Sequence, residues 1–251
     1  MLKLALITGA TSGIGEATAF KLAKNGVNLI ITGRRNDRLL ELKKKLEELQ
    51  ISVHSLCFDV RSNQEVTESL ENLPEEFKNI DLLVNNAGLA AGLTTLQEGD
   101  LDDWDRMIDT NVKGLLYVTR VVAPRMIERG SGQIINIGSI AGKEVYPNGN
   151  VYCASKHAVD ALTKGMRIDM LPHNIRVSQI CPGAVETEFS LIRFHGDKMR
   201  ADKVYEGYEC LVAEDIADCL WFIASRPPHI NINDMVVMPT SQASASIFHK
   251  A

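Results

Sequence analysis

Short apolar segments alternate with amphipathic segments along the whole chain. The apolar runs are rich in β-branched residues and are apolar at both odd and even positions, which is typical of strands buried on both faces of a parallel sheet. They are Leu4–Thr8, Val27–Thr32, Val53–Phe58, Leu82–Val84, Ile134–Ile137, Val177–Ile180 and Met235–Met238. Helical periodicity marks the segments Gly15–Asn25, Arg38–Gln50, Gln64–Leu73, Asp102–Arg129, Val151–Leu171 and Glu214–Ser225. The alternation predicts an α/β fold, a doubly wound Rossmann-type parallel sheet of about seven strands with helices on both faces.

One long irregular region, at about 183–209, separates a predicted strand from a late predicted helix. Long loops at the carboxyl ends of strands build substrate sites in folds of this kind. We interpret this region as a lid that covers the substrate, and the alternative is a surface insertion without a role. Because no repeat, linker or low-complexity stretch interrupts the chain, we expect one catalytic domain over residues 1–251.

Composition narrows the classes of function. A chain of 251 residues with 45% hydrophobic content can bury a core without disulfides or metals. Its net charge of −5 does not favour phosphate backbones, so we expect no nucleic-acid partner. Five cysteines without a C-x-x-C motif and six histidines without metal-ligand spacing predict no metal site. With neither a signal-peptide pattern nor an apolar run of about 20 residues, we expect a cytoplasmic protein that does not bind membranes.

A glycine-rich segment, Thr8-Gly9-Ala10-Thr11-Ser12-Gly13-Ile14-Gly15, follows the first predicted strand and opens the first helix. Glycines there permit a tight turn, a close backbone approach to a pyrophosphate and close packing of helix on strand. The helix N-terminus offers free N–H groups and a partial positive charge to the phosphates. Glycines alone are a weak signal, but the order of strand, glycines and helix favours dinucleotide binding.

The end of the second predicted strand carries Thr32-Gly33-Arg34-Arg35. An NAD site usually has a carboxylate there for the ribose 2′-hydroxyl, whereas arginine suits the 2′-phosphate of NADP. Adjacent guanidiniums give charge-assisted contacts to phosphate, so the sequence favours NADP. The nearest competing acid is Asp37, which we interpret as a first-turn or capping residue of the next helix. The alternative for the arginines is a solvated loop.

The segment Tyr152-Cys153-Ala154-Ser155-Lys156 places Tyr152 and Lys156 one turn apart on one helical face. A phenol with a pKa of about 10 is a poor base at neutral pH, and a nearby ammonium favours the phenolate. Ser139 follows another strand end, and its hydroxyl can hydrogen-bond a substrate oxygen. Taken alone, a tyrosine and a lysine at this spacing are also typical of a solvated surface pair.

Together these strings resemble the short-chain dehydrogenase/reductase family. The matching motifs occur in the family's order over roughly Lys3 to Met238, and they are Thr8-Gly9-x-x-x-Gly13-x-Gly15, Asn85-Asn86-Ala87-Gly88, Asn111, Ser139, Tyr152-x-x-x-Lys156 and Pro182-Gly183. The resemblance implies that Tyr152 is the general acid/base and that Lys156 lowers its pKa and holds the nicotinamide ribose. It also implies that Ser139 orients the substrate oxygen and that Asn111 holds a water that relays protons.

The resemblance further implies a set of NADP-binding residues along the carboxyl edge of the sheet. Beyond Arg34, Arg35, Tyr152 and Lys156, they are Gly9, Ser12, Gly13 and Ile14 at the pyrophosphate, Asp59 and Val60 by the adenine, Asn86, Ala87 and Gly88 along the ribose, and Pro182, Gly183, Val185 and Thr187 at the nicotinamide end. The bland alternatives are a simple turn at 85–88 and an ordinary helix-interior asparagine at 111.

A narrower likeness is to the NADP-dependent 3-hydroxy acid dehydrogenases, a group that includes serine 3-dehydrogenases and malonic semialdehyde reductase-like enzymes. It extends through the family's variable regions, in Thr187-Glu188-Phe189-Ser190, Arg193-Phe194 and His229-Ile230-Asn231-Ile232-Asn233. This likeness implies short 3-hydroxy acids or the matching semialdehydes as substrates, and a homotetramer. A carboxylate substrate calls for a cation, and we predict Arg193 in the lid. The alternative is that Arg193 binds a backbone carbonyl or a neighbouring acid such as Glu188.

Two rival functions remain open at the level of sequence. The first is a broad ketone or ketoacyl-thioester reductase of the same fold. The second is a non-catalytic protein that senses the dinucleotide, which an eroded serine, tyrosine and lysine set would have favoured. Ser139, Tyr152 and Lys156 are all present, so we expect an enzyme that acts on CH–OH groups.

Overall fold

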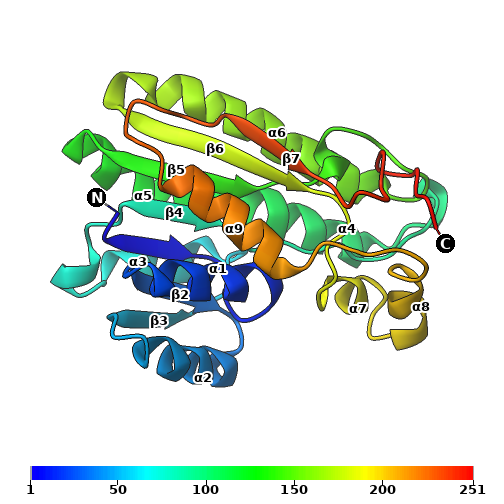
Figure 1. Ribbon diagram of the computed structural model, residues 1–251, viewed down its shortest axis with the longest axis horizontal. Helices are drawn as coiled ribbons and strands as arrows, with labels where there is room; N and C mark the ends of the chain where they lie inside the picture. Colours follow the sequence, from blue (N-terminus) through cyan, green and yellow to red (C-terminus); the bar gives the residue numbers. More distant parts are fainter. Residues whose placement is uncertain (1, 251) are drawn as a thin grey trace.

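The computed structural model describes residues 2–250 and contains a seven-stranded sheet in which every neighbouring pair of strands is parallel (Figure 1). The strands are β1 Leu4–Ile7, β2 Asn28–Gly33, β3 Val53–Cys57, β4 Leu82–Asn85, β5 Gly132–Ile137, β6 Ile175–Pro182 and β7 Asp234–Val237. Their spatial order is β3-β2-β1-β4-β5-β6-β7. The predicted doubly wound sheet is therefore confirmed, and the order reverses between β1 and β4, where folds of this type bind ligands.

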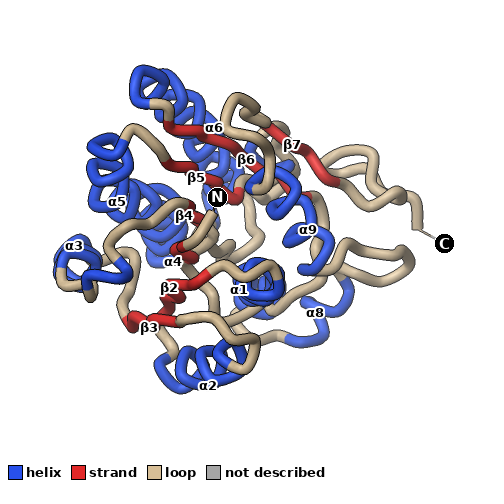
Figure 2. Tube along the Cα trace, turned by 60° about the vertical axis from the view of Figure 1, so that its left-hand side comes forward, coloured by secondary structure: helices blue, strands red, loops and turns tan. Residues whose placement is uncertain are grey.

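Helices cover both faces of the sheet (Figure 2). Their bounds are α1 Gly13–Lys24, α2 Asn36–Glu47, α3 Asn63–Glu71, α4 Leu101–Ile108, α5 Leu115–Arg129, α6 Asn150–Met170, α7 Phe189–Arg193, α8 Lys198–Lys203 and α9 Ala213–Ala224. Within residues 2–250, no helix has the length and apolar character needed to cross a membrane.

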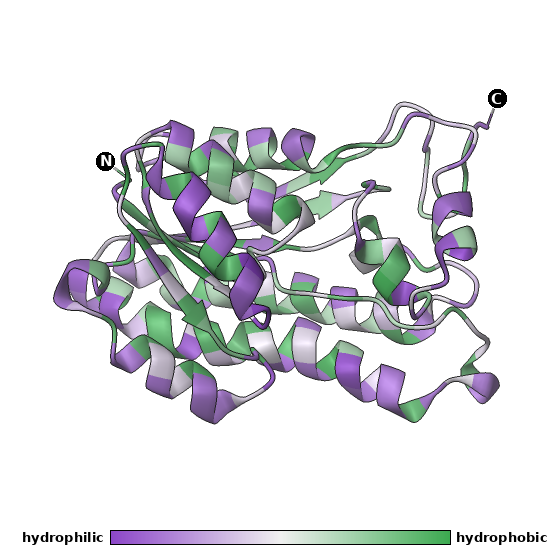
Figure 3. Cartoon of the chain, turned by 90° about the horizontal axis from the view of Figure 1, so that it is seen from below, coloured by the Kyte–Doolittle hydropathy of each residue, from purple (hydrophilic) through white to green (hydrophobic). Residues whose placement is uncertain are grey.

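Two apolar cores lie on opposite faces of the sheet. Side chains of α1, α2 and α9 pack on one face, for example Leu22, Leu39 and Leu220. Side chains of α3, α5 and α6 pack on the other, for example Val66 and Val118. Hydrophobic residues accordingly gather on the strands and on the inward helix faces in Figure 3. The five inner strands are buried on both faces, which explains why they read as continuous apolar runs, whereas the edge strands β3 and β7 are partly exposed.

The segment expected to be one helix, Asp102–Arg129, is interrupted. A π-helical turn at Asp109–Gly114 separates α4 from α5. Inside this turn, the side chain of Asn111 hydrogen-bonds the backbone of Leu89 rather than solvent. A Cβ atom on Gly114 would lie 2.8 Å from Val60 Cγ2, so the helix approaches the chain after β3 closely. Such π turns are frequent at functional sites, and apolar periodicity alone does not reveal them.

The region 183–209 is less irregular than its composition suggests, because it contains the short helices α7 and α8. Glu188 precedes α7, and Asp197 caps α8 by accepting a hydrogen bond from the Arg200 backbone N–H. Pairing of Val185 with Leu211 joins the two ends of the region, so it folds back over the carboxyl edge of the sheet. Figure 1 shows α7 and α8 projecting at that edge.

A buried polar chain ties β4 and β5 to the helices on one face. The Asn85 amide donates to Thr119 Oγ1 at 3.0 Å and to Asn136 Oδ1 at 2.9 Å. Asn136 in turn donates to Thr163 Oγ1 on α6 at 2.9 Å. These bonds satisfy polar groups inside an apolar core, and they fix the position of α6 relative to the end of β5.

Candidate active site

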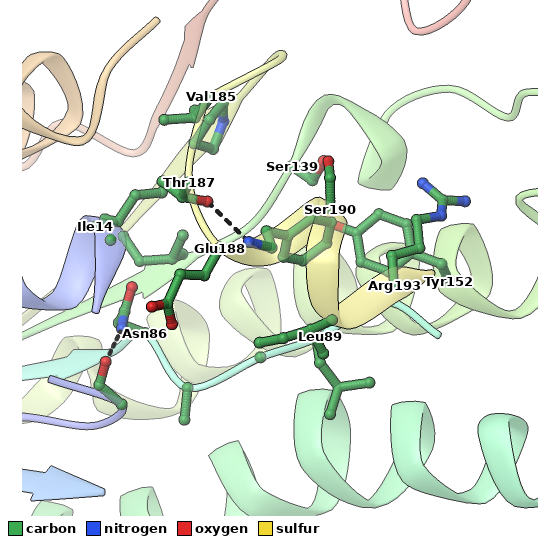
Figure 4. Close-up of a pocket in the computed structure, with 18 of the residues that line it drawn as sticks. Ile14, Asn86, Leu89, Ser139, Tyr152, Val185, Thr187, Glu188, Ser190 and Arg193 are labelled. Atoms are coloured by element: carbon green, nitrogen blue, oxygen red, sulfur yellow. Dashed lines mark hydrogen bonds between the residues drawn. The ribbon is translucent and has the colours of Figure 1, made fainter. Parts of the chain in front are cut away.

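A cleft of about 640 Å³ runs along the carboxyl edge of the sheet. Its lining comes from the turn after β1, the ends of β2 to β6, the start of α6 and the region 183–209. Every residue predicted at the cofactor or the substrate lies on this lining, and the exception among the predicted site residues is Asn111. Figure 4 shows that Ile14, Asn86 and Glu188 lie on one side of the pocket, with Tyr152 and Arg193 on the other.

The glycine-rich turn depends on close backbone packing. Gly9 and Gly13 have φ of +64° and +54°, in the left-handed region that favours glycine. A Cβ atom on Gly15 would lie 2.3 Å from the Gly9 carbonyl oxygen, so no other residue fits there without a shift of the backbone. The Asn86 amide closes the turn by donating to the carbonyl oxygens of Thr8 and Gly9 at 2.8 and 3.0 Å. The N-terminus of α1 therefore opens into the cleft.

The two adjacent arginines differ in their surroundings. Arg34 is exposed and lies 3.8 Å from Asp59. Arg35 is held in place, because its Nη2 donates to Thr11 Oγ1 and Ser12 Oγ at 3.0 Å each. Burial raises the pKa of Asp59, but hydrogen bonds from Arg61 and the charges of Arg61 and Arg34 outweigh it, so the pKa is lowered. The expected first-turn position of Asp37 in α2 is confirmed.

Tyr152 and Lys156 lie on the buried face of α6, with Ser139 after β5. Tyr152 is 8% exposed and Lys156 is 6% exposed, which excludes the interpretation of these two residues as a solvated surface pair. Burial raises the pKa of Tyr152, and the Ser139 hydrogen bond and the Arg193 charge lower it only in part. Burial also lowers the pKa of Lys156 to about 8. Lys156 Nζ donates to the Ile137 carbonyl oxygen at 2.9 Å, which directs it beneath the cleft.

Asn111 lies behind the cleft wall. Its Nδ2 donates to the Leu89 carbonyl at 2.8 Å and to Ser155 Oγ at 3.0 Å, and its Oδ1 accepts from the Leu89 N–H at 2.8 Å. A Cβ atom on Gly88 would lie 3.3 Å from Asn111 Oδ1 and 3.5 Å from Lys156 Nζ. Asn111 is therefore close to Lys156, and its amide group joins the loop after β4, at Leu89, to α6, at Ser155.

Arg193 lies at the substrate end of the cleft. Its Nε donates to the Gly92 carbonyl at 3.2 Å and its Nη1 to the Tyr146 hydroxyl at 3.0 Å. The guanidinium carbon lies 5.8 Å from the centre of the Tyr152 ring. Arg193 binds a backbone carbonyl, as the alternative interpretation expected, and it also lines the cleft, so its predicted role toward a substrate carboxylate stays a prediction. Glu188 is engaged with other arginines.

Several residues of the site were not predicted from the sequence. Tyr146 positions Arg193, and Phe189 packs edge-on against Tyr152 with 5.7 Å between ring centres. Arg38 joins Arg35 at Glu188. The only sequence signal for Arg38 is its position one turn into a helix that begins beside the predicted phosphate site. In residues 2–250, no group of three or more His, Cys, Asp or Glu side chains is arranged to hold a metal ion.

Comparison with known proteins identifies the family. A family model described as short chain dehydrogenase matches residues 3–195. The chain is 46% identical over 97% of its length to sulfoacetaldehyde reductase 2 of Chromohalobacter salexigens, covering 96% of that protein. It is 44% identical, again over 97%, to the NADP-dependent 3-hydroxy acid dehydrogenase YdfG of Escherichia coli strain K12, covering 98% of that protein. The chain belongs to the short-chain dehydrogenase family.

A solved structure gives the same result in three dimensions. The closed form of a serine dehydrogenase complexed with NADP⁺ superposes with a TM-score of 0.93 at 43% identity, and the match covers 99% of both chains. A serine dehydrogenase from Escherichia coli superposes with a TM-score of 0.83 at 39% identity, covering 96% of this chain and 99% of that one. The resemblance inferred from the motifs is therefore confirmed over the whole fold, including the region 183–209.

The buried ammonium of Lys156 should cost stability. A pKa near 8 in place of 10.5 corresponds to about 3 kcal/mol at about 1.4 kcal/mol per pKa unit. We expect Lys156→Met to be more stable than the wild type at pH 7 by about 1–3 kcal/mol, because Met fills the site without a charge. Urea unfolding of both proteins without added nucleotide measures this difference.

The pH dependence of the free energy of unfolding tests whether the buried charge of Lys156 causes this difference in stability. The folded wild type loses the Lys156 proton near pH 8, whereas the unfolded chain keeps it until about 10.5, so wild-type stability rises with pH across that window. The advantage of Lys156→Met should therefore shrink between pH 8 and pH 10. Lys164→Met, on the exposed face of the same helix, is the control and should give no gain. A less stable Lys156→Met at pH 7 would show that Lys156 is a net stabilising residue.

Proposed function

We propose that this protein is an NADP(H)-dependent oxidoreductase that transfers a hydride between NADP(H) and short 3-hydroxy acids or the matching 3-oxo acids and semialdehydes. The observation that carries the proposal is the position of Arg193, whose guanidinium lies against the ring of the buried Tyr152 within one cleft. This arrangement sets a cation for a substrate anion beside the group that exchanges a proton with the substrate oxygen. The named activities of the relatives, on a 3-hydroxy acid and on sulfoacetaldehyde, involve small anionic substrates of this kind.

The residues present fit NADP(H). The left-handed Gly9 and Gly13 and the N-terminus of α1 let the backbone of the turn come close to a ligand, as a pyrophosphate requires. Arg34 and Arg35 supply positive charge for a 2′-phosphate at the end of β2, near the adenine positions Asp59 and Val60. The remaining assignments run along the lining of the cleft, at Gly9, Ser12, Gly13, Ile14, Asn86, Ala87, Gly88, Tyr152, Lys156, Pro182, Gly183, Val185 and Thr187.

In the reducing direction, bound NADPH supplies the hydride that the carbonyl carbon accepts. Ser139 and Tyr152 hold the carbonyl oxygen by donating hydrogen bonds to it. Tyr152 then gives its proton to that oxygen, which leaves an alcohol and a phenolate. The ammonium of Lys156, one helical turn from Tyr152, would favour the phenolate, and a proton would return through Lys156, the ribose hydroxyl and a water held by Asn111. In the oxidising direction, the phenolate of Tyr152 removes the proton from the alcohol.

Substrate choice depends on Arg193. Its Nε and Nη1 are held by the Gly92 carbonyl and the Tyr146 hydroxyl, which fixes the plane of the guanidinium. We assign the remaining amino group, Nη2, to the substrate carboxylate. A rigid arginine loses little freedom when it binds an anion, and this favours short substrates that span Tyr152 and Arg193 at once.

Two other functions remain as outcomes of the tests. The apolar side chains of Phe189, Ile192 and Phe248 also line the cleft and would suit a bulky ketone or a ketoacyl thioester. A dinucleotide sensor would bind NADPH without turnover. We favour the enzyme because Ser139, Tyr152 and Lys156 lie together at the end of β5 and the start of α6.

We propose a homotetramer with one catalytic domain over residues 1–251 and a lid at about 183–209. Apolar side chains exposed on the outward faces of α5 and α6, including Leu116 and Ile168, support association between subunits. Sedimentation velocity should give a mass four times that of the chain, and a monomer would contradict this. We also propose a cytoplasmic location without nucleic-acid or membrane partners, which cell fractionation checks.

Tyr152→Phe removes the proton donor and keeps the ring. We expect kcat to fall by on the order of 100- to 10,000-fold, the usual contribution of a positioned acid or base. Fluorescence titration with NADPH should give a Kd within about twofold of the wild type, since the phenol oxygen contributes little to dinucleotide binding. Tyr117→Phe, on α5 away from the cleft, is the matched control. Near-normal turnover in Tyr152→Phe would overturn the mechanism.

Arg193→Met tests the substrate class. We expect KM for short 3-hydroxy acids such as serine or 3-hydroxypropionate to rise about 30-fold or more, because a charged hydrogen-bond partner is lost. Turnover of neutral secondary alcohols should change little. Arg200→Met is the control, because Arg200 lies in the same lid and stacks on Phe194. Equal losses on acids and neutral alcohols would show that Arg193 only supports the lid, and a wild type active on bulky ketones alone would favour the rival reductase.

A further inference from the structure

A carboxylate from the lid bridges two arginines on the far side of the cleft. Glu188, directly before α7, lies 2.9 and 3.0 Å from Arg38 Nη1 through its two carboxylate oxygens. One of these oxygens also accepts from Arg35 Nη1 at 3.1 Å. Arg38 lies in α2, about 150 positions earlier in the sequence. The bridge therefore joins the lid to the helix that follows the predicted phosphate-binding arginines.

The bridge continues into the glycine-rich turn. The second guanidinium nitrogen of Arg35 donates to the carbonyl oxygen and the hydroxyl of Thr11 and to the hydroxyl of Ser12. The residue before Glu188 is also in place, because a Cβ atom on Gly13 would lie 3.1 Å from Thr187 Cγ2. The start of the lid thus crosses directly over the turn that would hold the pyrophosphate.

The middle of the lid, at Arg193 and His195, is anchored separately. The Gly92 N–H donates to the Arg193 carbonyl at 3.0 Å, and the Arg193 side chain donates back to the Gly92 carbonyl. His195 Nε2 lies 3.0 Å from a carboxylate oxygen of Asp103 on α4. These contacts fasten the lid beside the substrate end of the cleft. The bridge of Glu188 is the corresponding anchor at the cofactor end.

We propose that Glu188 is a positioning residue that straps the lid across the dinucleotide through Arg38 and so sets the rate at which NADP(H) leaves. This inference rests on the cofactor position given under the proposed function. Arg38 does not line the cleft, whereas Arg34 and Arg35 do. The strongest part of the bridge therefore acts on the lid and leaves Arg34 for the 2′-phosphate. Opening the lid at this end breaks the bridge before the dinucleotide can leave.

The rival explanation is that Glu188 competes with the 2′-phosphate for Arg35. Four arginines face two carboxylates here: Arg34 and Arg61 face Asp59, and Arg35 and Arg38 face Glu188. Under competition, removing the Glu188 charge would tighten NADPH binding and leave NADH binding unchanged. If Glu188 instead straps the lid, the same change raises the dissociation rates of NADPH and NADH by the same factor, because the two dinucleotides differ only in the 2′-phosphate. The two explanations therefore predict opposite signs.

Stopped-flow fluorescence of NADPH and NADH dissociation tests the strap on the full chain. Glu188→Gln and Arg38→Gln should each raise the dissociation rate of both dinucleotides about threefold to tenfold, which is the scale of a partly exposed ionic network. The double variant should dissociate no faster than Glu188→Gln, because Glu188→Gln already removes the ion pairs with both Arg38 and Arg35. Association rates should change less than twofold, roughly, since the open lid admits the dinucleotide in every variant. Glu41→Gln, which removes a carboxylate paired with Lys45 on the outer face of α2, is the control and should match the wild type.

Unchanged dissociation in Glu188→Gln and Arg38→Gln would overturn the strap while leaving the proposed function intact. Slower release of NADPH alone would overturn it in favour of competition. Additive effects in the double variant would show that the two residues act separately and not through one bridge. A wild type that binds neither dinucleotide would instead overturn the proposed function, and the strap with it.

Discussion

The close approach of two backbone segments at the centre of the sheet governs the site. Because Gly15 has no side chain, α1 packs against the Gly9 carbonyl, and the Asn86 amide joins both to the chain after β4. This contact lies where the strand order reverses, so the chain on either side of it diverges and leaves a crevice. A methyl group at Gly15 would separate α1 from β4 and distort both walls of the cleft. The cofactor cradle is in this sense a consequence of packing as well as of composition.

Tyr152 and Lys156, the proposed catalytic pair, place two ionisable groups at the same edge of the sheet. Lys156 is buried beside the end of β5, where the Ile137 carbonyl is its hydrogen-bond partner. Burial destabilises both the ammonium of Lys156 and the phenolate of Tyr152, so the site favours transfer of a proton over storage of charge. The amide chain from Asn85 through Asn136 to Thr163 holds β5 and α6 in register beneath these groups. The network is itself incompletely satisfied, because among the described residues the buried Asn85 Oδ1 has no hydrogen-bond partner.

The sequence could predict the sheet, most helices and the central residues of the site, because these follow from local signals. Apolar runs mark buried strands, and the glycine turn, Ser139, Tyr152 and Lys156 occur at recognisable positions. The π turn at Asp109–Gly114 could not be predicted, because it depends on the Asn111 side chain binding the backbone of Leu89. The spacing of apolar residues is almost the same in an α-helix that contains one π-helical turn as in an uninterrupted α-helix, so this spacing cannot distinguish the two.

Contacts between distant segments account for the other omissions. Tyr146 holds Arg193 across 47 positions, and Arg38 meets Glu188 across 150. Neither pair has a spacing that identifies it, since each is defined by where the lid lies on the folded sheet. The sequence predicted an irregular loop for the lid, but the lid contains the helices α7 and α8. Helices this short are stable only when they pack against the rest of the protein, so local sequence signals do not reveal them.

The lid unites the two halves of the site. One short segment carries Thr187 over the glycine turn, Glu188 to the arginines of α2, and Arg193 to the wall beside Tyr152. Arg193 is the last residue of the five-residue helix α7, and Thr187 lies two residues before that helix, so α7 connects the two contacts directly. Under the proposed function, one segment of 7 residues would thus contact both the dinucleotide, at Thr187, and the substrate anion, at Arg193.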